Sequence, residues 1–296
     1  MKAILLFLSV GFLSMNLLLA QSVMSGKLKA NGTSYTYHYL EPPGDKKGVV
    51  ILLPGSGEKF KEILKYDGLA KLLFNSGFVV IVPEVHALLY ADGYSIILLD
   101  ALLQSKVKEY GVKPLFLGGF SSGGAIAARY AELLSATNTL MNLRGLFIVD
   151  PPLDLQRVYA AGKHRLQSCD GIIKQEGIRI ISDLEKAFGG PPDQRADQYI
   201  NHSAFTASVP DGGNAKYLVN IPVRLYSEPD LNFVKRTYCD QMEMNDLNAT
   251  DLEALHQYLI DQGNTQCEYI TTKGRGFHSW NIIEPNNLLA WMLKLY

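Results

Sequence analysis

The sequence predicts an α/β fold with a mostly parallel β-sheet and helices on both of its faces. The first observation is a regular alternation between residues 48 and 150, where short unbroken apolar runs are followed by longer segments of helical spacing. Strands covered on both faces give unbroken apolar runs, and their alternation with helices is typical of a parallel sheet. The second is the composition of the 296 residues, 47% hydrophobic and 19% charged, which is ordinary for a globular chain with a large core.

A β-hairpin is expected before this series begins. The stretch KLKANGTSYTYHYL (27–40) alternates polar with apolar or aromatic residues on both sides of Asn31-Gly32. Asn-Gly between two alternating segments is a strong hairpin signal. The chain is therefore expected to open with two antiparallel strands.

The parallel series follows in chain order. Strands are predicted at GVVILLPG (48–55), FVVIVPE (78–84), KPLFLGG (113–119) and RGLFIVD (144–150), with helices between them within 60–77, 92–110 and 123–134. After an interruption the series resumes with the strand IPVRLYSEPD (221–230), a helix over 246–262, the strand CEYITTK (267–273) and a helix over 284–295. The interruption, about 152–218, is rich in Pro, Gly, Asp and Gln and has one helix-like piece near 178–188, so we interpret it as an insertion rather than a second domain.

The N-terminus predicts export. Lys2 precedes an apolar run that closes on Leu18-Leu19-Ala20, the pattern of a signal peptide cleaved after Ala20. Residues 1–20 are expected to be removed, which leaves a secreted or periplasmic domain of residues 21–296. The alternative is an N-terminal membrane anchor, because the run approaches spanning length; polar residues within it weaken that reading.

Charge and cysteines exclude some classes of partner. A formal net charge of -1 argues against nucleic acid, whose binding needs a basic face. The three cysteines, Cys169, Cys239 and Cys267, have no zinc-ligand spacing, so no metal is expected. Exported chains can form disulfides. We predict a Cys239–Cys267 bond, because these two bracket the helix before the last strand while Cys169 lies apart in the insertion.

The segment Gly119-Phe120-Ser121-Ser122-Gly123 matches the G-x-S-x-G pattern. It follows an apolar strand and opens a helix, which is the setting that a nucleophile elbow requires. Ser121 has glycines two residues before and after it, whereas Ser122 has Phe120 two before it. Ser121 is therefore the predicted nucleophile, and the backbone N–H of Ser122 is a predicted oxyanion donor.

A serine nucleophile needs a base that an acid orients. Among the six histidines, His278 lies in the loop between the last strand and the last helix, at the strand edge where ligands meet open α/β sheets. His278 is the predicted base, and His86, after the second parallel strand, is the reserve. The acid candidates Glu228 and Asp230 follow one strand, and Asp150 follows another but precedes Pro151-Pro152, which favours a structural turn there.

The second oxyanion donor is expected in Pro54-Gly55-Ser56-Gly57, after the first parallel strand. Glycine lets backbone approach a ligand closely, and the N–H of Ser56 or Gly57 is the predicted donor. No glycine pattern of a phosphate or dinucleotide site occurs, so no cofactor is expected.

From residue 47 to 296 the chain resembles the α/β-hydrolase superfamily, in particular its secreted esterase- and peptidase-like members. The resemblance rests on VVILLPGSG, GGFSSGGAIAARYA, IPVRLYSEPD and GRGFHSW in that order. It implies a mostly parallel eight-stranded sheet, a lid inserted after the sixth strand, here about 152–218, and an acyl-serine mechanism without a cofactor. The chain departs from many members in having Pro54-Gly55 in place of His-Gly.

The resemblance also favours Asp230 as the acid, because in the family the acid stands three residues beyond a small residue that ends this strand, here Ser227. Two properties of the residues agree. Pro229 disfavours helical geometry at Glu228, and aspartate, the shorter side chain, orients an imidazole at lower entropic cost. The predicted triad is therefore Ser121, Asp230 and His278.

The predicted function is that of an exported serine hydrolase that cleaves a carboxylic ester, small or oligomeric. One alternative is a serine peptidase of the same fold. Another is a non-catalytic binding protein, since a fold does not fix a function. No membrane contact is expected after signal cleavage, and the sequence does not indicate an oligomeric state.

Overall fold

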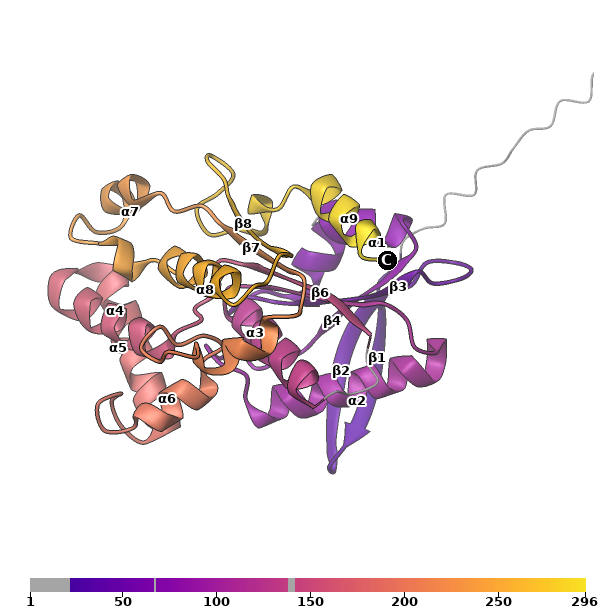
Figure 1. The fold of residues 1–296 in the computed structure, drawn as a ribbon, viewed down its shortest axis with the longest axis horizontal. Helices are drawn as coiled ribbons and strands as arrows, with labels where there is room; N and C mark the ends of the chain where they lie inside the picture. Colours follow the sequence, from indigo (N-terminus) through magenta and orange to yellow (C-terminus); the bar gives the residue numbers. More distant parts are fainter. Residues whose placement is uncertain (1–21, 67, 138–141) are drawn as a thin grey trace, which may run out of the picture.

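The computed structural model describes residues 22–66, 68–137 and 142–296 (Figure 1). The predicted signal peptide, residues 1–20, lies outside the described residues. In the part of the chain that is described, no helix is both long and apolar enough to cross a membrane.

The chain begins with the predicted hairpin, and this prediction is confirmed. Strand β1 (Met24–Ala30) pairs antiparallel with β2 (Thr33–Leu40). The two residues between them, Asn31 and Gly32, have φ angles of 48° and 78°. Two consecutive left-handed residues match the twist of the flanking strands, which is why Asn-Gly is favoured there.

The sheet has eight strands in the order β1-β2-β4-β3-β5-β6-β7-β8. The remaining strands are β3 (Gly48–Leu53), β4 (Phe78–Pro83), β5 (Leu115–Phe120), β6 (Leu143–Val149), β7 (Val223–Ser227) and β8 (Cys267–Thr271). Strands β2 and β4 are antiparallel, and every pair from β4 to β8 is parallel. The predicted eight-stranded, mostly parallel sheet is confirmed, and the carboxyl ends of β3, β5, β6 and β7 meet at one edge.

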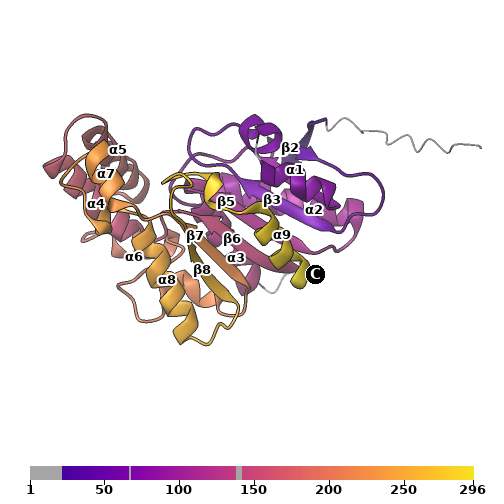
Figure 2. The same cartoon turned by 90° about the horizontal axis from the view of Figure 1, so that it is seen from above.

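Helices cover both faces of this sheet, as Figures 1 and 2 show. One apolar cluster joins the sheet to α2 (Gly93–Tyr110), α3 (Ser122–Ala136) and α8 (Ala249–Asp261). The other joins it to α1 (Gly68–Asn75) and α9 (Pro285–Lys294). The six residues of β3 are all buried, and those from Val49 to Leu53 alternate between the two clusters, which explains its unbroken apolar run.

The insertion between β6 and β7 is more helical than its composition predicts. It contains α4 (Leu155–Ser168), α5 (Gly171–Phe188), α6 (Ala196–His202) and the 3-10 helix η2 (Gly213–Leu218). The first three share an apolar cluster of their own, which packs against Leu89 and Tyr90 after β4. Figure 2 shows α4, α5 and α6 gathered at one end of the molecule, together with α7 (Leu231–Thr237). The insertion therefore covers part of the carboxyl edge of the sheet.

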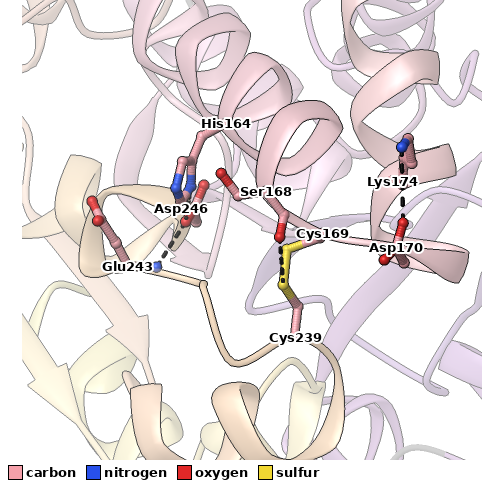
Figure 3. The surroundings of a disulfide bond; sticks show 8 residues. All are labelled: His164, Ser168, Cys169, Asp170, Lys174, Cys239, Glu243 and Asp246. Carbon is pink, nitrogen blue, oxygen red and sulfur yellow. Dashed lines mark hydrogen bonds and ion pairs between the residues drawn. A yellow bond between two sulfur atoms is a disulfide. The ribbon is translucent and has the colours of Figure 1, made fainter.

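The disulfide differs from the prediction. Cys239 bonds to Cys169 (Figure 3). Cys267 is free and buried. Cys267 begins β8 inside the core, where burial raises the pKa of its thiol to about 12. Cys169 instead belongs to a small apolar cluster with Val234 and Met242, from the segment that carries Cys239. The bond joins the insertion to the segment after β7. The separation of 70 residues between the two cysteines in the sequence gives no indication that they lie close together.

Candidate active site

Ser121 stands between β5 and α3 in a strained turn, with φ 52° and ψ -126°. Glycines around it permit close packing that a side chain would block. A Cβ on Gly119 would lie 2.3 Å from the carbonyl oxygen of Gly123, and one on Gly123 would lie 2.3 Å from that of Leu53. The G-x-S-x-G glycines are thus needed for the geometry, and Ser121 is held at the start of a helix.

Asp150 stands beside Ser121 at the same edge. The N–H of Ser121 donates to the carbonyl of Val149 at 2.9 Å, and Phe120 is the register partner of Val149. Asp150 also has a left-handed backbone, φ 46°, and besides Ser121 only Asn31 shares this feature among the described residues that are not glycine. Such strain costs about 1–3 kcal/mol per residue and concentrates at functional sites.

His278 reaches this pair from the loop after β8. Its Nδ1 lies 2.5 Å from Oδ2 of Asp150. The Asp150 side chain is 8% exposed and the imidazole 36% exposed, and the ring lies 4.5 Å from that of Phe120, the neighbour of Ser121. Within the described ranges no hydrogen bond joins the Ser121 hydroxyl to the imidazole. Such bonds are often long before substrate binds.

The two acids predicted after β7 lie elsewhere. Asp230 caps α7, because its Oδ1 accepts from the N–H of Phe233 at 2.8 Å. Glu228 accepts from Thr272 and from the backbone of residues 274–276. The structure therefore pairs the imidazole with Asp150, not with Asp230. The proline pair after Asp150 suggested a structural turn, but the strained turn leaves the Asp150 carboxylate facing the histidine loop.

The predicted oxyanion loop forms a tight turn. The N–H of Glu58 donates to the carbonyl of Gly55 at 3.1 Å, and Gly57 has φ 83°, as the third residue of a type II turn requires. The N–H of Gly55 donates to the Glu58 carboxylate at 2.8 Å. In the described structure the N–H groups of Ser56 and Gly57 have no protein partner. As the first residue of α3, Ser122 also has an N–H with no intrahelical partner.

Glu58 links this turn to the histidine loop. Its Oε2 accepts from Nε1 of Trp280 at 3.1 Å. The Phe120 ring packs against Gly55 of the turn and lies 5.8 Å from the ring of Trp280. Burial raises the pKa of the Glu58 carboxyl, although the hydrogen bonds from Gly55 and Trp280 oppose that rise. The turn, the elbow and the histidine loop thus pack as one unit.

A second serine–histidine–carboxylate arrangement, which the sequence analysis did not predict, lies across β1, β2 and the end of β4. Ser25 Oγ lies 2.8 Å from Nδ1 of His38, and Nε2 of His38 lies 2.8 Å from Oε1 of Glu84. Cross-strand register could have revealed it, since Ser25 pairs with His38, which in turn pairs with Val82. The reserve base, His86, pairs with Asp92 at 2.6 Å and stacks on Tyr94.

No metal site emerges from the described residues. No group of three or more His, Cys, Asp or Glu side chains in these ranges is arranged to hold a metal ion. An open groove of about 540 Å³ lies on the insertion, between α4 and α5, and its lining contains none of the predicted site residues.

Comparisons with known proteins bear on the fold. No family model matches the sequence, and no curated protein matches it. Among solved structures, an esterase of the fungus Rhizomucor miehei has a TM-score of 0.62 and 14% identity, covering 93% of this chain and 85% of that chain. A thermostable carboxylesterase cloned from a metagenomic library has a TM-score of 0.59 and 12% identity, covering 93% and 87%.

A third structure extends this similarity. Carboxyl esterase 2 of the mycorrhizal fungus Tuber melanosporum has a TM-score of 0.58 and 17% identity, and covers 95% of this chain and 86% of that chain. The chain has the α/β-hydrolase fold, so the predicted fold class is confirmed.

Proposed function

We propose that this protein is a serine hydrolase of carboxylic esters, with Ser121 as nucleophile, His278 as base and Asp150 as acid. The observation that carries the proposal is the 2.5 Å contact between His278 and an Asp150 that stands next to the strained Ser121. Fold-level similarity to esterases supports the reaction class.

The geometry supports the following sequence of steps. The Ser121 hydroxyl attacks the ester carbonyl while Nε2 of His278 takes its proton. Asp150 accepts from Nδ1–H, which fixes the tautomer and stabilises the imidazolium. His278 then protonates the leaving alcohol, which departs from the acyl-serine. Water, deprotonated by His278, attacks the acyl carbonyl and releases the carboxylic acid and Ser121.

Negative charge on the carbonyl oxygen would be stabilised by backbone donors. Ser122 supplies one N–H from the start of α3, and Ser56 or Gly57 supplies the second from the turn after β3. One such donor contributes on the order of 10²–10³ in kcat. Because the glycine turn packs on Phe120, these donors are held before substrate arrives.

The insertion would act as the lid that shapes the substrate pocket. Its aromatic residues reach the loop after β4, where the ring of Phe188 lies 5.1 Å from that of Tyr90. We favour esters, small or oligomeric, over peptides, because the solved structures with a similar fold are esterases. A serine peptidase remains the second candidate.

We also propose that the protein is exported after removal of residues 1–20. The Cys169–Cys239 disulfide supports this, since such bonds persist in oxidising compartments. N-terminal sequencing of protein recovered from the medium or periplasm should begin near Gln21. An intact Met1 on membrane-bound material contradicts the proposal.

The decisive test of activity uses p-nitrophenyl esters and the matched p-nitroanilides. The wild-type protein should hydrolyse the esters, and Ser121→Ala should reduce kcat by roughly 10⁶-fold. Ser25→Ala, which alters the other serine–histidine pair, is the control and should keep full activity. Faster anilide hydrolysis favours the peptidase, and no turnover of any substrate favours a binding protein.

A further inference from the structure

The loop that carries His278 is attached to the end of β7 by one carboxylate. Glu228 follows Ser227, the last residue of β7, and is only 6% exposed. Gly274 and Gly276, which precede His278, have φ angles of 75° and 109°. These conformations turn the peptide N–H groups of the loop inward, toward Glu228.

Four donors converge on this carboxylate. Oε1 accepts from the N–H of Gly274 at 3.0 Å and from that of Gly276 at 3.3 Å. Oε2 accepts from the N–H of Arg275 and from the Thr272 hydroxyl, both at 2.8 Å. Successive backbone N–H groups around one anion form a nest. Burial would raise the pKa of Glu228, but these donors outweigh it and lower the pKa, so the carboxylate is charged.

The far side of the loop is fixed as well. The guanidinium of Arg275 donates from Nε to the carbonyl of Asn281 at 2.6 Å and from Nη2 to that of Ile283 at 3.0 Å. His278 therefore lies in the short segment 275–283, which we call the arch. The Arg275 side chain joins the two ends of this arch. The backbone of Arg275 is in turn held by Glu228.

We infer that Glu228 is a positioning residue, whose carboxylate sets the arch so that the His278 imidazole meets Asp150 beside Ser121. This rests on the proposed function. Glu228 does not touch the imidazole; its oxygens are occupied by the four loop donors. Glu228 affects the reaction only by setting the position of the base, His278.

Glu228→Gln tests the inference with little change in shape. The amide turns an acceptor into an NH2 donor that faces N–H groups of the loop, so at least one contact becomes repulsive. A misplacement near 1 Å costs on the order of 10² in rate. We expect kcat to fall about 10²-fold with KM changed by less than about threefold, because substrate contacts remain.

Asp230→Asn is the matched control. Asp230 lies two residues further on the same turn and also accepts a backbone N–H, but from Phe233 in α7. It should keep kcat within about twofold of wild type, since it does not hold the base. Thr272→Val removes one of the four donors and should lower kcat less than Glu228→Gln does.

A second readout separates positioning from loss of fold. The Nδ1 proton between His278 and Asp150 should give a strongly deshielded proton resonance in the wild-type protein. Glu228→Gln should broaden or remove this signal while the melting curve stays cooperative, and Asp230→Asn should keep it. If Glu228→Gln does not fold, Thr272→Val tests the inference by the same two measurements, kcat and the Nδ1 proton resonance.

Two outcomes overturn the inference: wild-type kcat and an unchanged resonance in folded Glu228→Gln, or equal losses in Glu228→Gln and Asp230→Asn. Wild-type values in Thr272→Val overturn it where Glu228→Gln does not fold. Failure of the proposed function looks different, because the wild-type protein would then turn over no ester, or Ser121→Ala would retain the activity, whatever Glu228→Gln does.

Discussion

Two regions of this molecule join a serine, a histidine and a carboxylate, and they differ in what surrounds them. In the first, Ser25, His38 and Glu84 form a complete chain of hydrogen bonds, each of 2.8 Å. In the second, His278 pairs with Asp150 at 2.5 Å, and in the described structure the neighbouring Ser121 hydroxyl makes no hydrogen bond to the imidazole. By hydrogen bonds alone, the first would be the better triad.

The surroundings reverse that ranking. Ser25 is exposed on a regular edge strand, and His38 stacks face to face on Phe60 with ring centroids 3.5 Å apart. Ser121 and Asp150 instead occupy strained turns at the carboxyl ends of adjacent parallel strands, next to a helix start and a glycine turn that offer free N–H groups. Catalysis needs donors for developing charge, and in the described structure only the second region assembles them around its serine.

Exchange of the acid gives the largest expected difference between the two regions. Asp150→Asn should lower kcat by about 10⁴-fold, because an amide favours the wrong imidazole tautomer. Glu84→Gln, the corresponding change in the first region, should leave kcat unchanged. Steady-state kinetics on a p-nitrophenyl ester measures both, and a large loss in Glu84→Gln would break the comparison.

Removal of the first histidine should affect stability and not catalysis. His38→Ala empties a buried site, loses the stack on Phe60 and frees two hydrogen-bond partners. The cost should be about 2–4 kcal/mol of unfolding free energy, measured by denaturant titration. Ser25→Ala should cost less than about 1 kcal/mol, since Ser25 is exposed. An unchanged kcat in both variants would show that the first region has a structural role and no catalytic one.

The smallest expected effect is on the pH dependence of stability, and it comes from Glu228, the carboxylate that holds the loop of the second region. The pKa of Glu228 lies below its ordinary value of 4.5, so its charged form stabilises the fold above that pH. This contribution is lost as pH falls through the lowered pKa. Melting temperatures of wild type and Glu228→Gln should therefore differ at neutral pH and converge in strong acid. A gap that widens toward acid contradicts the assignment.

Sequence patterns predicted the parts of this fold that depend on neighbours along the chain. The Asn31-Gly32 hairpin, the apolar strands and the Ser121 turn each follow from local spacing and glycine placement. The insertion is more helical than predicted, because α4 and α5 bury their apolar faces against each other, and this pairing does not show in the composition of the segment.

The acid and the disulfide depended on proximity in three dimensions. Asp150 and Asp230 both follow strands, and only the backbone turns decide that one carboxylate faces His278 while the other caps α7. Likewise Cys239 is nearer in sequence to Cys267 than to Cys169, yet β8 buries Cys267 in the core. Neither choice is encoded in spacing along the chain.

Identification of the serine that reacts with a fluorophosphonate tests the central claim most directly. The wild-type protein would be labelled under native conditions, digested, and the modified peptide mapped by mass spectrometry. The account predicts a single adduct on Ser121, with labelling lost in Ser121→Ala and retained in Ser25→Ala. An adduct on Ser25, or on any serine other than Ser121, would contradict it.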